Sequence, residues 1–180
     1  LPLCGKTLTS YFGAEGTPTS LKKVTVVGDT TLADRAFADC SQLTSIVLPS
    51  DLTAIGESAF DGCTGLEEIT LPLCGETLKD RLGVEVVPDS LKKVTVVGDT
   101  TLADRAFADC AQLTSIVLPS SVTAIGDSAF EGCTNLEEMT LPLCGKTFAS
   151  YFGESGVPAS LKKVTVVGDT VLADRAFADC

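Results

Sequence analysis

The sequence predicts a solenoid of stacked units, mainly β with short helices (α/β by some schemes), whose parallel strands form a ladder of about seven rungs. The first observation is a period of 70 residues, because residues 21–40, 91–110 and 161–180 differ only where Val171 replaces a threonine. The second is a shorter spacing of apolar strand patterns within each block. Periods this strict are typical of arrays in which each unit packs on its neighbours, rather than of a globule with one central pocket.

The first element of each short unit is a strand with the head pattern LxxIxL or LxxVxV. In the unit that begins at Leu43, Ile46 and Leu48 share one face of an extended strand, and Ser45 and Val47 share the other. The heads are separated by 22, 23, 25, 22, 23 and 25 residues, a spacing typical of leucine-rich repeats. They begin at Leu21, Leu43, Leu66, Leu91, Leu113, Leu136 and Leu161.

The second half of each unit returns the chain to the next rung. Pro49 ends the first strand because it has no N–H to donate, and the alternation in residues 52–56 predicts a second short strand. Residues 58–63 suit a helical turn, which would place Phe60 and Cys63 on one inner face. The same slot recurs, so we expect one internal phenylalanine ladder from Phe37, Phe60, Phe107, Phe130 and Phe177.

Every third unit carries an insert, in residues 4–20, 74–90 and 144–160. Apolar pairs four residues apart, such as Leu78 and Leu82, predict a short helix with one buried stripe, followed by a helix-ending glycine. The inserts also differ more among the three copies than the strands do, which is compatible with ligand binding or with the ordinary tolerance of loops.

We expect residues 1–180 to form one array, and the end residues to make it a piece of a longer one. Leu1 and Cys180 both match residues that lie inside repeats, so the terminal rungs would lack caps. Uncapped edges predict possible end-to-end self-association. The expected rungs are 1–20 (partial, with a helical insert), 21–42, 43–65, 66–90 (with insert), 91–112, 113–135, 136–160 (with insert) and 161–180.

The motif LxxIxLPxxLTxIGxxAFxGC, present in residues 43–63 and 113–133, closely resembles the BspA-like, or Treponema pallidum type, leucine-rich repeats. The CGKTLTSYFG insert is also similar to one in large BspA-like proteins of gut bacteria. The resemblance implies a right-handed β-solenoid, exported to the bacterial cell surface, in proteins often associated with adhesion. It implies no particular ligand.

Composition excludes several classes of function. Thirteen basic and 24 acidic residues give a net charge of −11, which argues against nucleic acid or an anionic membrane as a partner. No run approaches the ~18 apolar residues of a membrane span, so we expect no membrane insertion by this segment. The chain has no histidine, and almost every residue has a counterpart 70 positions away, so we expect no enzyme and no catalytic residue.

The eight cysteines leave two interpretations open. They either serve as buried free thiols, or pair between neighbouring rungs as Cys40–Cys63 and Cys110–Cys133. No CxxC motif is present, and without histidine a zinc site would need four cysteines or carboxylates. We therefore expect no metal site and no cofactor.

Charged strand positions predict the register of the ladder. In register, Glu68 faces Lys93 and Glu138 faces Lys163, which either helps to fix the register or forms a polar stripe for a ligand. Asp34 and Arg35 are expected to form a local pair or to remain solvated.

Two hypotheses of function follow: binding of an unidentified protein or glycan, or a structural stalk or spacer in the cell envelope. The first places the ligand on the outward strand face or on the variable inserts. Candidate ligand-binding residues on the strands are Lys23, Thr25, Ser45, Val47, Glu68, Thr70, Lys93, Thr95, Ser115, Val117, Glu138, Thr140, Lys163 and Thr165. Those in the inserts are Tyr11, Arg81 and Tyr151.

Overall fold

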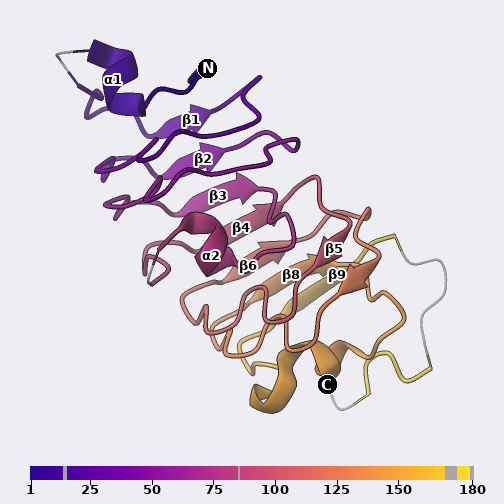
Figure 1. The fold of residues 1–180 in the computed structure, drawn as a ribbon. Coiled ribbons are helices and arrows are strands. Elements are labelled where there is room, and N and C mark those ends of the chain that lie inside the picture. The colour runs from indigo at the N-terminus through magenta and orange to yellow at the C-terminus, as the bar shows by residue number, and fades with distance from the viewer. Residues whose placement is uncertain (14–15, 85, 169–173, 179–180) are drawn as a thin grey trace.

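The structure, a computed structural model, describes residues 1–13, 16–84, 86–168 and 174–178 and confirms the solenoid fold class. Its strands stack side by side along the long axis of the molecule, with α1 (Leu8–Phe12) at the N-terminal end (Figure 1). Seven of the described strands form one parallel sheet in the order β1-β2-β3-β4-β6-β8-β9. They are β1 Lys23–Thr25, β2 Ser45–Val47, β3 Glu68–Leu71, β4 Lys93–Val96, β6 Ser115–Val117, β8 Glu138–Leu141 and β9 Lys163–Val166.

The register of this sheet follows the apolar pattern of the strand heads. Val24 pairs with Ile46, Ile46 with Ile69, and Ile69 with Val94, all of them buried. A shift of one residue would turn these side chains toward solvent, so the core selects the register. The core is one continuous column inside the stack.

The second strand predicted for residues 52–56 is reduced to one bridge there, and a two-residue strand forms at the equivalent position of the next block. β5 (Thr101–Leu102) pairs in parallel with β7 (Ala124–Ile125), and Thr31 bridges to Ala54 in the preceding block. Gly126 follows β7 at a point where the neighbouring rung lies very close, because a Cβ there would lie 2.4 Å from the Ala103 carbonyl carbon. A glycine is therefore required at this position.

The helical turn predicted for residues 58–63 is wrong, although the burial of Phe60 and Cys63 is right. This segment consists of successive turns, and Ser58 has a φ of 53°. Its backbone groups bond within the segment, as when Cys63 N donates to Phe60 O at 3.1 Å, and also to the adjacent rung, as when Phe37 N donates to Ala59 O at 2.8 Å. The left-handed backbone at Ser58 and the bonds to the adjacent rung thus hold the segment as turns rather than as a helix.

The single phenylalanine ladder is likewise corrected. Phe37 stacks on Phe60, and Phe107 on Phe130, each pair with ring centroids 5.6 Å apart. Between the two pairs lies the second insert, which fills the column with leucines instead. Phe177 is 42% exposed and contacts Phe148, a residue of the third insert.

Each insert takes the place of the turns in its rung and bonds to the rung that follows. α2 (Leu78–Leu82) is capped by Thr77, and Leu78 N donates to Ala106 O at 2.7 Å. The third insert forms η2 (Phe148–Ser155), a 3₁₀ segment broken at Gly153, rather than an α-helix, and Phe148 N donates to Ala176 O at 2.7 Å. Within the described ranges, no helix has the length and apolar character needed to cross a membrane.

Candidate functional site: the outward strand face and the inserts

The outward face of the seven-stranded sheet presents two rows of side chains, one from each outward-pointing strand position. The row of Lys23, which we name the charged row, runs through Ser45, Glu68, Lys93, Ser115 and Glu138 to Lys163. The row of Thr25, which we name the Thr/Val row, runs through Val47, Thr70, Thr95, Val117 and Thr140 to Thr165. All of these residues are exposed or half-buried, so the sheet brings fourteen of the predicted candidates onto one face.

The predicted charge register is confirmed. Glu68 is the register partner of Lys93, and Glu138 is the partner of Lys163. One position before the strands, Lys162 Nζ lies 3.1 Å from Glu137 Oε2. Pairs this exposed contribute about 0.2–1 kcal/mol each, so they favour the register without dominating stability.

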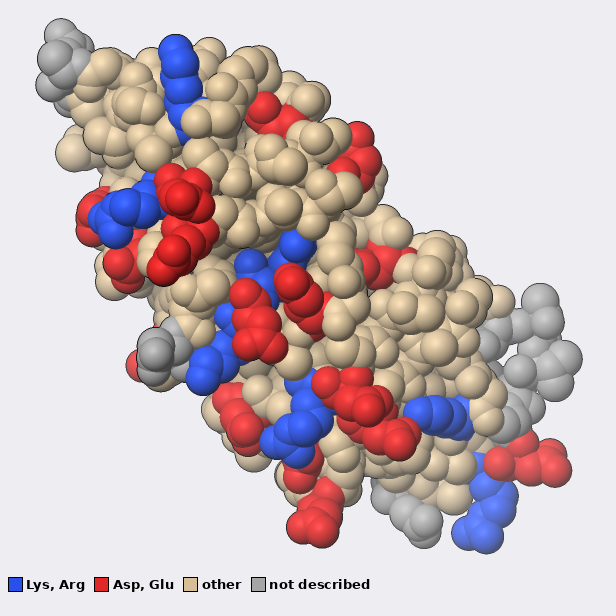
Figure 2. Space-filling view, viewed as in Figure 1, with Lys and Arg blue, Asp and Glu red and all other residues tan. Residues whose placement is uncertain are grey.

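Charges of both signs are interspersed along the molecule. Figure 2 shows basic and acidic side chains lying next to one another from one end of the visible face to the other. A surface of this kind lacks the single-signed field that nucleic acid or an anionic membrane would recognise. A partner for it would need matching charges of both signs.

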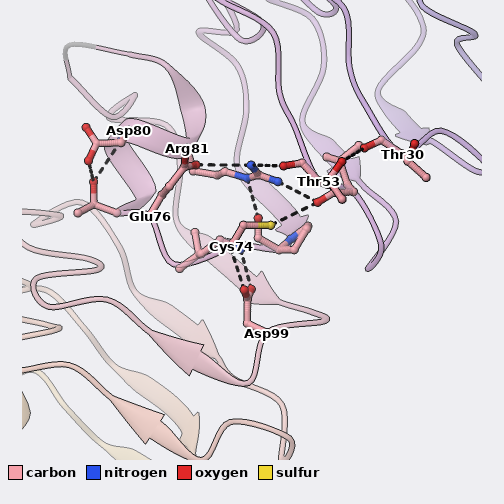
Figure 3. A network of polar contacts seen from close by, with 11 residues as sticks. Thr30, Thr53, Cys74, Glu76, Asp80, Arg81 and Asp99 are labelled. Atoms are coloured by element: carbon pink, nitrogen blue, oxygen red, sulfur yellow. Dashed lines mark hydrogen bonds and ion pairs between the residues drawn. The ribbon is translucent and has the colours of Figure 1, made fainter.

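Arg81 is buried, and the expectation that it contacts a ligand is therefore wrong (Figure 3). Its guanidinium donates from Nε to Pro72 O at 2.9 Å, and from Nη2 to Leu52 O at 3.0 Å. Nη1 reaches Thr53 O at 3.3 Å and lies 3.5 Å from the carboxylate of Glu76. Arg81 therefore fastens α2 to the preceding rung.

Asp99 holds the start of the same insert from the other side (Figure 3). Its carboxylate accepts hydrogen bonds from Leu73 N at 2.6 Å and Cys74 N at 2.8 Å, and the residue is only 7% exposed. Asp29 accepts from the equivalent amides of Leu3 and Cys4 in the first insert. The recurring aspartate is thus a structural acceptor for backbone N–H groups. Its third copy lies outside the described residues.

Tyr151, the second predicted ligand contact in the inserts, is also buried, which corrects that expectation. Its hydroxyl donates to Leu143 O, and its ring packs edge-on against Phe130 with centroids 6.3 Å apart. Lys146 Nζ lies 5.9 Å from the centre of the Tyr151 ring and donates to Ile125 O at 2.9 Å. Tyr151 is part of the core.

Tyr11 differs from Tyr151 although the two occupy equivalent positions. Tyr11 is 47% exposed, and its ring lies edge-on to Phe12 at 5.9 Å. Among the residues that the structure describes, none covers the Tyr11 ring as Phe130 covers that of Tyr151. Of the three candidates in the inserts, Tyr11 offers its side chain to solvent.

The cysteines are free thiols at all seven positions that the structure describes, but the interpretation as buried thiols holds for Cys40, Cys63, Cys110 and Cys133, whereas Cys4 and Cys74 are exposed. Cys63 Sγ lies 3.1 Å from Phe37 O, and Cys133 Sγ lies 3.2 Å from Phe107 O. Burial raises the pKa of Cys63 and that of Cys110 to about 12, and raises the pKa of Cys133 further. The buried thiols are therefore neutral core groups at physiological pH.

The exposed turns carry ion pairs of a different kind from the one predicted. Arg35 does not pair with Asp34; its guanidinium lies 3.0 Å from Asp39 and 3.8 Å from Asp61 on the next rung. Asp34 instead accepts a hydrogen bond from Glu57 N at 2.9 Å. Arg105 repeats the arrangement with Asp109 and Glu131.

A cleft of about 540 Å³ lies between these turns and the loop after α2, and Phe60, Cys63, Val84, Val87 and Pro88 are among its lining residues. It lies away from the two outward rows. Across the described part of the chain, no three cysteine, aspartate or glutamate side chains are close enough together to hold a metal ion.

Sequence reasoning missed the anchoring roles of Asp99 and Arg81. One signal was available for Arg81, because Glu76 and Arg81 change together to Lys146 and Tyr151 in the third insert. Nothing in the sequence distinguished Asp99 from the other repeated aspartates.

Comparison with known proteins gives a family match over most of the chain. A model of the BspA-type leucine-rich repeat region matches residues 19–82 and 89–180 in six copies. No curated protein matches the chain.

Similar solved structures are leucine-rich repeat proteins from three bacteria. The protein from T. pallidum is 28% identical, with a TM-score of 0.39, over 79% of this chain and 68% of its own. The protein from Bacteroides ovatus is 25% identical, with a TM-score of 0.38, over 83% of this chain and 44% of its own. A leucine-rich cell surface protein from Faecalibacterium prausnitzii is 23% identical, with a TM-score of 0.40, over 89% of this chain and 40% of its own. This chain thus spans less than half the length of the last two.

Proposed function

The chain belongs to the BspA-type leucine-rich repeat family, and from this premise we propose that it is a non-catalytic binding module of an exported bacterial surface protein. Its ligand would be a protein or a glycan outside the cell. One observation carries the proposal: the two outward rows form a regular, solvent-facing surface that the core does not need. Threonine, serine, lysine and glutamate side chains on that surface supply donors and acceptors every ~4.8 Å.

The absence of catalysis is part of this proposal. Each acidic or basic side chain on the face recurs in the next block, whereas an active site is normally a single constellation of residues. The cysteines of the core have raised pKa values, which suits packing rather than nucleophilic attack.

The alternative is a stalk or spacer with no ligand of its own. The burial of Arg81 and Tyr151 favours it, because the variation between the inserts then serves internal packing and not recognition. In a stalk, the outward rows would only maintain solubility and register.

Binding to a panel of immobilised extracellular matrix proteins and glycans would separate the two functions. We expect the chain to bind at least one ligand, and the double variant Lys93→Ala/Thr95→Ala to weaken that binding. Val86→Ala, in the exposed loop after α2, is the matched control and should bind normally. Failure against the whole panel, while a longer protein that contains this array still binds, would favour the stalk.

A further inference from the structure

The two outward rows have a periodicity of three rungs. Along the sheet, the charged row reads Lys, Ser, Glu, Lys, Ser, Glu, Lys, and the Thr/Val row reads Thr, Val, Thr, Thr, Val, Thr, Thr. The residues before the charged row repeat its signs, with Lys22, Glu67, Lys92, Glu137 and Lys162 on the same five rungs. When the first six rungs are read in reverse order, every lysine of the charged row lies opposite a glutamate and every serine opposite a serine.

We propose that the outward face binds the same face of a second copy of this chain, about a two-fold axis parallel to the strands between β3 and β4. Such an axis reverses the order of the rungs and keeps the direction of the strands. Each row of one copy then lies over the same row of the other. This inference rests on the proposed function and names the partner of the face.

In that alignment the charged row places opposite charges together on four of the six overlapping rungs and serine over serine on the other two. Lys23 faces Glu138 of the second copy, Glu68 faces Lys93, and Ser45 faces Ser115. Glu68 and Lys93 are also neighbours within one sheet, so the Glu68 and Lys93 side chains of the two copies form a square of alternating charges around the axis. Opposite charges so placed favour association and disfavour other partners.

The Thr/Val row matches in the same alignment. Val47 faces Val117 of the second copy, and the threonines face threonines. The apolar pairs of one copy therefore meet those of the other, and no charge lies over a valine. Isologous two-fold interfaces have this property of self-complementarity.

Other alignments fail in identifiable ways. A shift by one rung brings Lys over Lys or Glu over Glu at the axis. A two-fold axis along the stack, over the Thr/Val row, places the charged row of one copy over the row of Val27 and Val97 in the other. That row carries no charged residue. A shift of three rungs restores the match, with the axis through β6, but only five rungs then overlap.

The expected affinity follows from size and charge. Six rungs extend for about 29 Å, and a face only a few residues wide over that length is small among stable interfaces. The dimer of the 180-residue chain should therefore be weak and should weaken further as salt screens the charges. Longer arrays with more matching blocks would associate more strongly.

Sedimentation of the full chain at low and high salt tests the proposal. We expect reversible dimers at low salt that dissociate at 0.5 M salt, where the Debye length is only about 4 Å. Val47→Glu alone and Val117→Lys alone should each weaken dimerisation by about tenfold or more, since each places charges against valines. An equimolar mixture of the two variants should recover much of it, because a new glutamate then faces a new lysine.

Two controls make the result decisive. Val86→Glu lies outside the face and should dimerise normally, and a mixture of Val47→Lys with Val117→Lys should show no recovery. A monomer under all conditions would overturn the proposal. Dimers that Val47→Glu does not weaken would overturn it as well, because they would form through the ends of the stack or about the axis through β6. A chain that stays monomeric but binds the ligand panel overturns self-recognition alone, whereas a chain that does neither overturns the proposed function as well.

Discussion

The second and third inserts occupy equivalent rungs of the same solenoid and are held there by different chemistry. In the second, the guanidinium of Arg81 donates to three carbonyl groups, with Glu76 as its charged partner. In the third, the ring of Tyr151 packs on Phe130, and Lys146 donates to Ile125 O. In both inserts, side chains of the insert donate hydrogen bonds to carbonyl groups of the preceding rung and of the insert's own rung.

This comparison explains how Arg81 and Tyr151 can differ and yet both be buried. A buried arginine is stable only where hydrogen bonds replace the water it loses, and the carbonyls of Pro72, Leu52 and Thr53 provide those partners. A buried tyrosine needs a single acceptor for its hydroxyl and apolar contacts for its ring. The same slot therefore holds either residue, with Glu76 beside the arginine and Lys146 beside the tyrosine.

The largest effect is expected from Tyr151→Ala. Removing a fully buried aromatic ring leaves a cavity beside Phe130, and we expect a loss of about 4 kcal/mol in the free energy of unfolding. Urea denaturation followed by circular dichroism would measure it. Tyr11→Ala is the matched control and should cost much less, because that ring is 47% exposed. Equal losses at the two positions would show that the third insert does not depend on aromatic packing.

The next effect in size is expected from Arg81→Met. Methionine keeps most of the apolar volume but leaves the carbonyls of Pro72, Leu52 and Thr53 without the donors of Arg81, which should cost about 3 kcal/mol. Lys79→Met, on the exposed side of α2, should change the denaturation midpoint little. If the two variants unfold at the same urea concentration, the guanidinium is not the anchor of the second insert.

A smaller effect is expected from Asp99→Ala. The substitution removes the acceptor for Leu73 N and Cys74 N, one of them in a fully buried residue, and should cost about 2 kcal/mol. Asp29→Ala makes the same change in the first insert, where the aspartate is half-buried, so its cost should be lower. Amide hydrogen exchange at Leu73 and Leu3 would report each loss locally. Unchanged protection of Leu73 in the Asp99 variant would contradict the role assigned to this carboxylate.

Periodicity allowed the solenoid, the strands and their register to be predicted, because those elements repeat and each depends on a local apolar pattern. The orientation of Arg81 and Tyr151 could not be predicted in the same way. An arginine in a helical insert normally points to solvent, and only the positions of the carbonyls on the preceding rung reverse that expectation. The turns at residues 58–63 were misread for a related reason, since part of their hydrogen bonding runs to another rung and leaves no trace in local spacing.

The smallest expected effect is the energetic coupling between positions 76 and 81, and it tests the comparison of the two inserts most directly. Arg81→Tyr alone should destabilise the chain, because Glu76 then lies beside a ring and loses its cation. Adding Glu76→Lys reproduces the pair found in the third insert and should recover about 1 kcal/mol relative to the sum of the single changes. A double-mutant cycle by urea denaturation measures this coupling, and Lys79→Glu in place of Glu76→Lys provides the control. If the two changes are simply additive, Lys146 and Tyr151 in the third insert do not depend on each other. The difference between the inserts would then not require the exchange of one anchoring pair for another.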